Sequence, residues 1–247
     1  MKIRSIHAFA IASDLLGGPP TTPERRPAWT THAEVASPMA HFPRFKRLRA
    51  SWRPRWPSVA CLVTADDGSW GLGMTRYGTP VIAIINEHLA PLLVGESCTD
   101  TDHAWALMQG MTSPYAGGLS WYAVSAIDLA LWDLKGKLLG QPVHALLGAP
   151  ARTHIDCYAT GNDTDWILEL GFGATKVACP HGPADGMRGL DHNEAFIANT
   201  RAAIGRDRDL MVDCWMAFDV DYAVIFAQRM ATHRLRWIED CLMPDDL

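Results

Sequence analysis

The fold is decided by three short apolar segments, ATKVAC (174–179), DLMVDC (209–214) and LRWIED (235–240). Helical patterns at about 191–204 and 219–232 separate them, and strand–helix–strand order is typical of parallel neighbouring strands. Upstream, THIDCYA (153–159) has the same apolar character and is followed by a helical pattern at about 164–170. The sequence therefore predicts four parallel strands within residues 151–247.

The spacing of these strands limits the architecture that they can form. Ile155, Lys176, Met211 and Trp237 mark the four strands, and only 97 residues follow residue 150. A closed eight-stranded barrel needs roughly 200 residues. The segment is therefore expected to be either an open four-stranded sheet or the first half of a barrel.

Residues 1 to about 150 mix strands and helices without a repeating order. A first strand at 1–12 is followed by a proline-rich and glycine-rich loop to about residue 56 and by a predicted hairpin at 58–65 and 69–77. We expect an α+β domain here.

Capping signals predict where the helices begin and end. Thr79-Pro80 reads as an N-cap and first helical residue, before an apolar stripe at Ile82, Ile85, Leu89 and Leu92. Further helices are expected from about Thr101 and from Ser120 to Leu139, where Gly140 ends the second one. Asp191-x-x-Glu194 resembles a capping box at the start of a later helix.

Composition excludes several classes of protein. The chain has 247 residues, a formal charge of −5 and 48% hydrophobic residues, which is typical of a globular protein with a sizeable core. It contains no apolar run of about 18 residues, so we expect no membrane-spanning helix. MKIRSIHAFAIAS (1–13) superficially resembles a signal peptide, but its short apolar part is interrupted by His7. We interpret it as a strand.

Six cysteines are spread along the chain, at positions 61, 98, 157, 179, 214 and 241. Their spacing fits neither a zinc knuckle nor a disulfide framework. We expect reduced thiols in a cytoplasmic protein. The cysteines at the ends of predicted strands are interpreted as small packing residues.

Charged residues at the strand ends are the first candidates for chemistry. Asp213 and Glu239 end consecutive predicted parallel strands, and α/β folds place their sites at that end. Two carboxylates there can bind a hard cation such as Mg²⁺. Lys176, on the preceding strand, can act as a base or stay charged and neutralise an anion. Taken singly, each residue also fits an ordinary solvated strand end.

A basic stretch, FPRFKRLRASWRPRW (42–56), holds six basic residues, four aromatic residues and no acid. Such a pattern can bind single-stranded nucleic acid by stacking and charge. The negative net charge and the lack of an RNA-binding module argue against that interpretation. Two other interpretations of this stretch are a loop that faces an anion in an active site and a loop that is merely solvated.

AVSAIDLALWDLKGK (123–137) resembles the helical signature of the mandelate racemase and muconate lactonizing enzyme branch of the enolase superfamily. The order of the strands that carry Lys176, Asp213 and Glu239 also matches that family. The resemblance implies a capping domain at 1–150, followed at 151–247 by the first half of a TIM-like (β/α)7β barrel that binds Mg²⁺. It assigns Asp213 and Glu239 as metal ligands.

Shorter segments most resemble the L-rhamnonate dehydratase family and related sugar-acid dehydratases, notably VDCWM (212–216) and WIEDCLMP (237–244). The resemblance implies a hydro-lyase that converts a sugar acid through an enediolate into a 2-keto-3-deoxy acid. It places Lys176 as the catalytic residue beside the metal, with Arg49 and His181 as substrate-binding residues. Trp215 and Ala178 depart from the wider family, and Ala178 replaces the second lysine of a common Lys-x-Lys pair, which disfavours racemisation.

In that family the third carboxylate ligand and a His/Asp dyad come from later strands. We therefore expect the 247-residue chain alone to be inactive and to associate through unpaired strand edges. The competing hypothesis is a non-catalytic half-barrel that serves in assembly or complementation. The expected partners are a small-molecule sugar acid and further copies of the chain in a homo-oligomer, without nucleic acid or membrane.

Overall fold

The computed structural model describes residues 1–11, 35–46, 56–115, 117–148 and 152–244. Two compact units divide these residues. The first unit holds 1–11 and the described residues from 56 to 153, and the second holds 35–46 and 154–244. The expected capping domain, 1–150, thus includes a segment, 35–46, that packs with the second unit. Ala36 N donates to Cys179 O there, at 2.8 Å.

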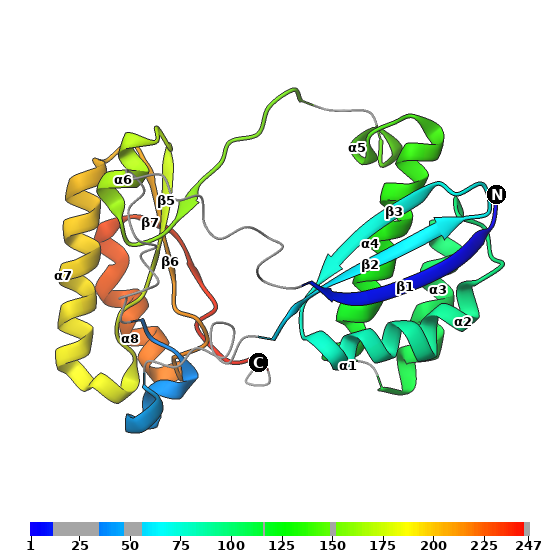
Figure 1. The fold of residues 1–247 in the computed structure, drawn as a ribbon. Helices are drawn as coiled ribbons and strands as arrows, with labels where there is room; N and C mark the ends of the chain where they lie inside the picture. Colours follow the sequence, from blue (N-terminus) through cyan, green and yellow to red (C-terminus); the bar gives the residue numbers. More distant parts are fainter. Residues whose placement is uncertain (12–34, 47–55, 116, 149–151, 245–247) are drawn as a thin grey trace. The chain divides into compact units, whose positions relative to one another are not determined.

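The first unit is a three-stranded antiparallel sheet with helices on one face (Figure 1). Its strands lie in the order β1-β2-β3, which confirms the predicted hairpin of β2 and β3 and pairs β1 with β2. The core lies between this sheet and the long helix α4. The elements are β1 (Ile3–Ile11), β2 (Ser58–Ala65), β3 (Trp70–Thr75), α1 (Gly78–Ala83), a π-helical segment (Ile84–Leu89), α2 (Ala90–Leu93), α3 (Thr101–Thr112), α4 (Leu119–Leu139) and α5 (Val143–Leu146).

The family signature in α4 is explained by its contact with β3. Ala126 and Ala130 lie so close to the strand that a Cβ on Gly73 would come within 1.9 Å of Ala126 O. One and two turns further along, Asp133 accepts a hydrogen bond from Leu72 N (2.8 Å) and Lys137 Nζ donates to the Trp70 carbonyl (3.1 Å). The helix therefore both packs on β3 and satisfies part of its exposed edge.

The start of α1 differs from the prediction. The helix begins at Gly78 rather than after a Thr79 cap, because the chain enters it through Tyr77 in a left-handed conformation (φ 69°). Gly78 N then donates to Pro57 O at 3.1 Å. The buried stripe also differs, since Val81 and Leu93 are buried with Ile85 and Leu89, whereas Leu92 is exposed. The predicted helices from Thr101 and to Leu139 are confirmed, and Gly140 ends the latter in a left-handed conformation.

The second unit is a four-stranded parallel sheet in the order β4-β5-β6-β7, as predicted. Helices α7 and α8 cover one face of it (Figure 1). The strands and helices are β4 (Ala159–Thr160), α6 (Thr164–Glu169), β5 (Ala174–Ala178), α7 (Gly186–Ile204), β6 (Asp209–Asp213), α8 (Val220–Met230) and β7 (Leu235–Glu239), and short 3₁₀ turns lie at Pro38–His41, Pro43–Phe45, Ser113–Tyr115, Pro183–Asp185 and Ala231–His233.

Two predictions within this unit are wrong in detail. The strand expected at 153–159 is regular only at Ala159–Thr160, where it lies at the sheet edge with one neighbour, and Ile155 is 75% exposed. Helix α7 begins at Gly186, so Asp191 and Glu194 lie inside the helix and form no capping box. They bind Arg229 of α8 instead, with Asp191 at 2.7 Å.

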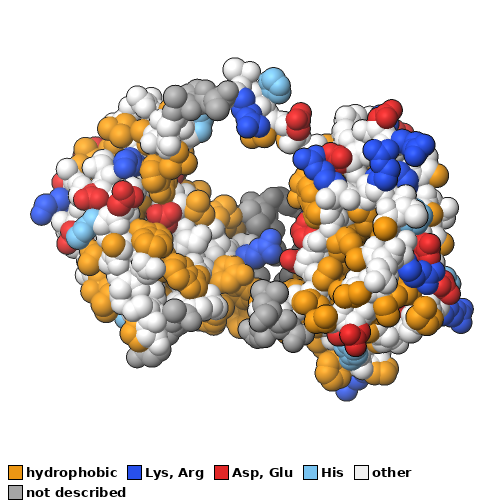
Figure 2. Space-filling model, turned by 180° about the vertical axis from the view of Figure 1, so that it is seen from behind, with side chains coloured by type: hydrophobic (Ala, Val, Ile, Leu, Met, Phe, Trp, Pro, Cys, Tyr) orange, Lys and Arg blue, Asp and Glu red, His pale blue; other side chains and the backbone are white. Residues whose placement is uncertain are grey.

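Burial confirms most of the packing expected for the cysteines. Cys179 and Cys214 are buried between the sheet and its helices, and Cys241 is partly buried. Cys157 is exposed, contrary to expectation, because the segment before β4 does not enter the sheet. Both units also leave hydrophobic side chains on their surfaces among charged ones (Figure 2). Among the described residues, we find no helix with both the length and the apolar character that a bilayer crossing needs.

Candidate metal centre

The structure brings together three of the residues that the sequence singled out. Asp213 and Glu239 are register partners at the carboxyl ends of β6 and β7. Lys176 lies on β5, two residues before Ala178, which is the partner of Asp213. Because side chains two residues apart on a strand share a face, Lys176 points to the same face as the two acids. Its Nζ lies 2.6 Å from Glu239 Oε1 and 3.7 Å from Asp213 Oδ2.

Further contacts fix the orientation of each charged group. Asp213 Oδ1 accepts a hydrogen bond from the Trp215 backbone N at 3.0 Å. Glu239 Oε2 accepts one from the Trp237 indole Nε1, also at 3.0 Å. The ring of Tyr158 lies 5.5 Å from Lys176 Nζ, which adds a cation–π contact. Each carboxylate thus keeps one oxygen engaged by the protein and directs the other toward the ammonium.

Burial and pairing act against each other in the electrostatics of this centre. Burial disfavours the charge on Lys176, but the hydrogen bond to Glu239 and the charge of Asp213 outweigh burial and raise the Lys176 pKa. Burial would raise the pKa of Glu239, but the hydrogen bonds from Lys176 and Trp237 outweigh burial and lower that pKa. For Asp213, burial dominates and raises the pKa, although Lys176 opposes the shift. The site therefore holds carboxylates partly removed from water.

Sequence reasoning missed a third acid, Asp240. Strict alternation along β7 would direct residue 240 to the face opposite Glu239. The strand ends at Glu239, however, and Asp240 has φ 49°, so its carboxylate reaches the same space. One oxygen each from Asp213, Glu239 and Asp240 lies within 4.8 Å of the others. Left-handed backbone also occurs at Trp215 and Met216 after β6, so conformations that cost energy gather around this centre.

The donor set fits a hard divalent cation. All three groups offer carboxylate oxygens, which Mg²⁺ prefers. Three ionised carboxylates and the Lys176 ammonium carry a formal net charge of −2, which a divalent ion balances. The ammonium between two of the acids shows that they share one space in which positive charge is stabilised.

The two predicted substrate-binding residues lie elsewhere or outside the described part of the chain. Arg49 is outside the described residues. His181 follows β5 in the loop to α7, and its side chain contacts Asp185 and His192 rather than the acids of the metal centre. Neither residue is brought to the metal centre by the contacts that the structure describes.

The chain belongs to the mandelate racemase and muconate lactonizing enzyme branch of the enolase superfamily. The sequence profile of the "Mandelate racemase / muconate lactonizing enzyme, N-terminal domain" matches residues 53–148. The profile described as "Enolase C-terminal domain-like" matches residues 164–247. The capping domain and the parallel barrel strands expected from the sequence are thereby confirmed as the fold class.

The chain is similar to proteins named L-rhamnonate dehydratase. One from Saccharopolyspora erythraea is 40% identical over 248 residues, which cover 100% of this chain and 63% of the relative. The crystal structure of L-rhamnonate dehydratase from Gibberella zeae has a TM-score of 0.88 at 30% identity, covering 99% of this chain and 59% of that one. A second Gibberella zeae structure, described as complexed with Mg, has a TM-score of 0.87, also at 30% identity. It covers 99% of this chain and 61% of that one. The chain thus spans about three fifths of the length of these relatives.

Proposed function

We propose that this chain serves in the Mg²⁺-dependent dehydration of a sugar acid, L-rhamnonate or a related aldonic acid, to a 2-keto-3-deoxy acid. The observation that carries the proposal is the cluster of Asp213, Glu239 and Asp240 beside Lys176 at the carboxyl ends of parallel strands. The names of the relatives support the choice of sugar acid. We expect a homo-oligomer in the cytoplasm, with no nucleic-acid or membrane partner.

Each residue of the centre has a defined part in this proposal. Asp213 and Glu239 hold Mg²⁺, and Asp240 adds a third oxygen donor. A bound Mg²⁺ supplies positive charge that makes the proton next to a substrate carboxylate more acidic. Lys176 lies beside the acids of the centre. Its ammonium would pair with the substrate carboxylate, or its neutral amine would accept the proton from the carbon next to that carboxylate. Overall, the α C–H bond and the β C–O bond break, water leaves, and the resulting enol becomes the 2-keto acid.

Arg49 and His181 stay as predictions for substrate binding. For Arg49, the argument is its position in the basic stretch, which a carboxylate substrate would favour. For His181, the argument is its position at the carboxyl end of β5, where α/β folds bind ligands.

The metal assignment is tested by titrating Mn²⁺ into the chain and measuring free Mn²⁺ by electron paramagnetic resonance, with Mg²⁺ as the competitor. We expect saturable binding by the wild type and strongly weakened binding by Asp213→Asn, since the amide removes one anionic ligand. Asp209→Asn is the matched control, because Asp209 lies at the other end of β6 and pairs with Arg236. Equal binding by wild type and Asp213→Asn would remove the metal assignment.

A second candidate function is assembly without catalysis by this chain. The observation that favours it is that β4 and β7, as described, each have a single neighbouring strand. Such edges pair readily with strands of another chain. A protein with this role would bind other copies or a complementary segment while its metal centre stayed inactive.

A further inference from the structure

A second polar site lies in the same unit and is lined by residues other than those of the metal centre. Residues 35–46 and the loop between β5 and α7 enclose a cavity of about 370 Å³. Arg44 and Lys46 line it from the first segment, and His181 and Asp185 line it from the loop. None of the four acidic or basic residues of the metal centre belongs to its lining.

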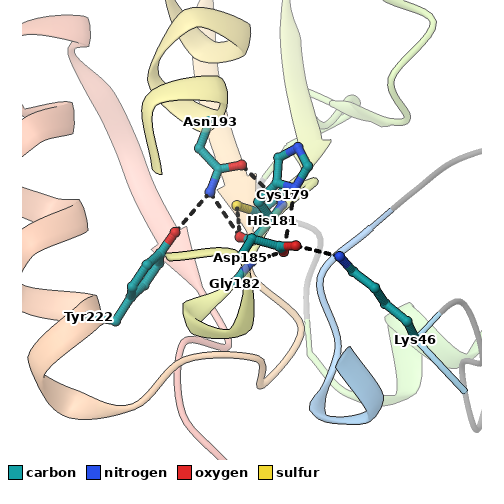
Figure 3. Close-up of polar contacts among 7 residues, drawn as sticks. All are labelled: Lys46, Cys179, His181, Gly182, Asp185, Asn193 and Tyr222. Atoms are coloured by element: carbon teal, nitrogen blue, oxygen red, sulfur yellow. Dashed lines mark hydrogen bonds and ion pairs between the residues drawn. The ribbon is translucent and has the colours of Figure 1, made fainter. Parts of the chain in front are cut away.

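Asp185 is fully engaged at the wall of this cavity (Figure 3). One of its oxygens forms a short ion pair with Lys46, and the other accepts a hydrogen bond from Gly182 N at 3.2 Å. That second oxygen also lies 3.4 Å from His181 Nδ1. Burial would raise the Asp185 pKa, but the hydrogen bonds from Lys46 and Gly182 outweigh it and lower the pKa. The single carboxylate of the cavity is therefore ionised and already balanced by Lys46.

The backbone of His181 is held by a buried asparagine. Asn193 of α7 is 0% exposed, and its side chain both accepts from His181 N (3.0 Å) and donates to His181 O (2.8 Å). Tyr222 of α8 extends the network at 3.3 Å from Asn193 Nδ2 (Figure 3). Gly189 allows α7 to lie this close, because a Cβ there would come within 3.0 Å of His181 Cβ. The backbone of His181 is thus held in place, and its imidazole directs Nδ1 toward Asp185.

Two nitrogen-bearing groups at the cavity have no hydrogen-bond partner among the described residues. The Arg44 guanidinium lies 5.2 Å from the centre of the Phe45 ring and forms no ion pair with a carboxylate of the described residues. His181 Nε2, on the opposite side of the ring from Nδ1, has no hydrogen-bond partner within the described ranges. Because Lys46 already balances Asp185, the cavity carries the uncompensated charge of Arg44.

We propose that this cavity binds a small anion that carries a carboxylate or phosphate group, held by Arg44 and, when the imidazole is protonated at both nitrogens, by His181 Nε2. A guanidinium is suited to such ligands because its planar donors match two oxygens at once. The contact from Lys46 to Asp185 fixes residues 35–46 against the turn before α7, and so positions Arg44 at the rim. The site gives the basic stretch that begins at residue 42 a role that the metal centre does not require.

The test uses the complete 247-residue chain without divalent metal, so that its result does not depend on dehydratase activity. Inorganic phosphate and glutarate are titrated separately by calorimetry, and the stronger of the two identifies the type of anionic group. We expect saturable one-to-one binding. Arg44→Gln should weaken it by about tenfold or more, the factor that corresponds to one lost hydrogen bond to a charged group.

The matched control is Arg188→Gln, which removes the same charge from an exposed arginine in the first turn of α7 that does not line the cavity. Binding by this variant should stay within a factor of about two, the scale of a screened surface charge. His181 imidazole resonances, assigned by their loss in His181→Gln, should shift on saturation with the anion. Absence of saturable millimolar binding of both anions, or equal weakening in the two arginine variants, would overturn the proposal.

Discussion

Asn86 takes the place of a strand partner at the free edge of β1. Its side-chain oxygen accepts a hydrogen bond from Ala8 N at 2.7 Å, and its side-chain nitrogen donates to Ala8 O at 2.9 Å. Ala8 is 1% exposed, so water cannot easily replace either bond. Asn86→Ala should therefore lower the free energy of unfolding by about 2–4 kcal/mol, because two buried backbone groups lose their partners.

Denaturant unfolding measures this loss, with Glu87→Ala as the control from the next, exposed position of the same helical segment. That change should stay within about 0.5 kcal/mol of the wild type. If Asn86→Ala were as stable as the control, the side-chain bridge to Ala8 would carry no net stability. Sequence periodicity cannot predict this role, since the π-helical segment Ile84–Leu89 shifts the positions that face the sheet.

At the candidate site, sequence reasoning reached the residues that follow strand geometry and missed the one that departs from it. Asp213 and Glu239 meet because parallel strands end at one edge, and Lys176 joins them through period-two alternation. Asp240 joins the cluster through a left-handed backbone turn. Side-chain alternation gives no signal for such a turn, so a sequence pattern could not have assigned this third oxygen donor.

In the first unit, strand β3 packs closely on helix α4 because β3 has glycine at the contact positions. A Cβ at Gly73 would meet Ala126 O at 1.9 Å, and one at Gly71 would meet Ala130 O at 2.0 Å. Both obstacles are backbone atoms of α4 at positions where the helix packs on the sheet, and backbone atoms cannot rotate away. Gly73→Ala should thus separate strand and helix and lower the free energy of unfolding by about 3 kcal/mol or more.

Gly110→Ala provides the opposite result from the same chemical change. Gly110 lies on the exposed face of α3, with nothing within 4 Å of its added Cβ. Alanine is the better helix former, so this variant should be more stable by about 0.5–1 kcal/mol. Thermal unfolding monitored by circular dichroism distinguishes the two. Similar melting temperatures for both variants would contradict the close contact between β3 and α4.

Elements were predictable where one local signal dominates, and were misplaced where signals compete. The apolar runs of β5 and β6 are buried in the sheet, that of β7 is partly buried, and the ends of all three strands agree with the predicted ones to within a residue. The start of α7 was placed too late because Gly186 and Gly189 are poor helix formers. Asp185 and His181 pack against Gly189, and this tertiary packing overrides the weak helix propensity of glycine.

For the whole molecule, the sequence predicted an α+β unit followed by parallel βαβ units, but not which unit receives residues 35–46. That segment lies far from β5 in sequence, and only the fold brings Ala36 to Cys179 and Lys46 to Asp185. The prolines and charges of a loop specify no partner. Long-range placement of this kind requires knowledge of the surface against which the loop packs.

The last prediction concerns a protein that consists of these 247 residues alone. Within the described residues, β4 and β7 are edge strands, and the metal centre contains carboxylates and a lysine but no histidine. Proton abstraction needs a base positioned within hydrogen-bond reach of the substrate. Lys176 donates to Glu239 at 2.6 Å, so its amine is engaged before any substrate arrives. We therefore expect no sugar-acid turnover near the usual enzyme range of roughly 1–10³ s⁻¹.

The two edges should also make this protein associate, because unpaired backbone groups on parallel strands pair with those of other copies. Size-exclusion chromatography with light scattering measures association, and a 2-keto acid assay with Mg²⁺ and a panel of aldonic acids measures turnover. Asp213→Asn, assayed in parallel, identifies contaminating activity, since turnover that persists in this variant cannot come from the proposed metal centre. A monodisperse monomer with turnover in that range that is lost in Asp213→Asn would show that the described strands suffice for catalysis, and would contradict both the edge argument and the need for a further base.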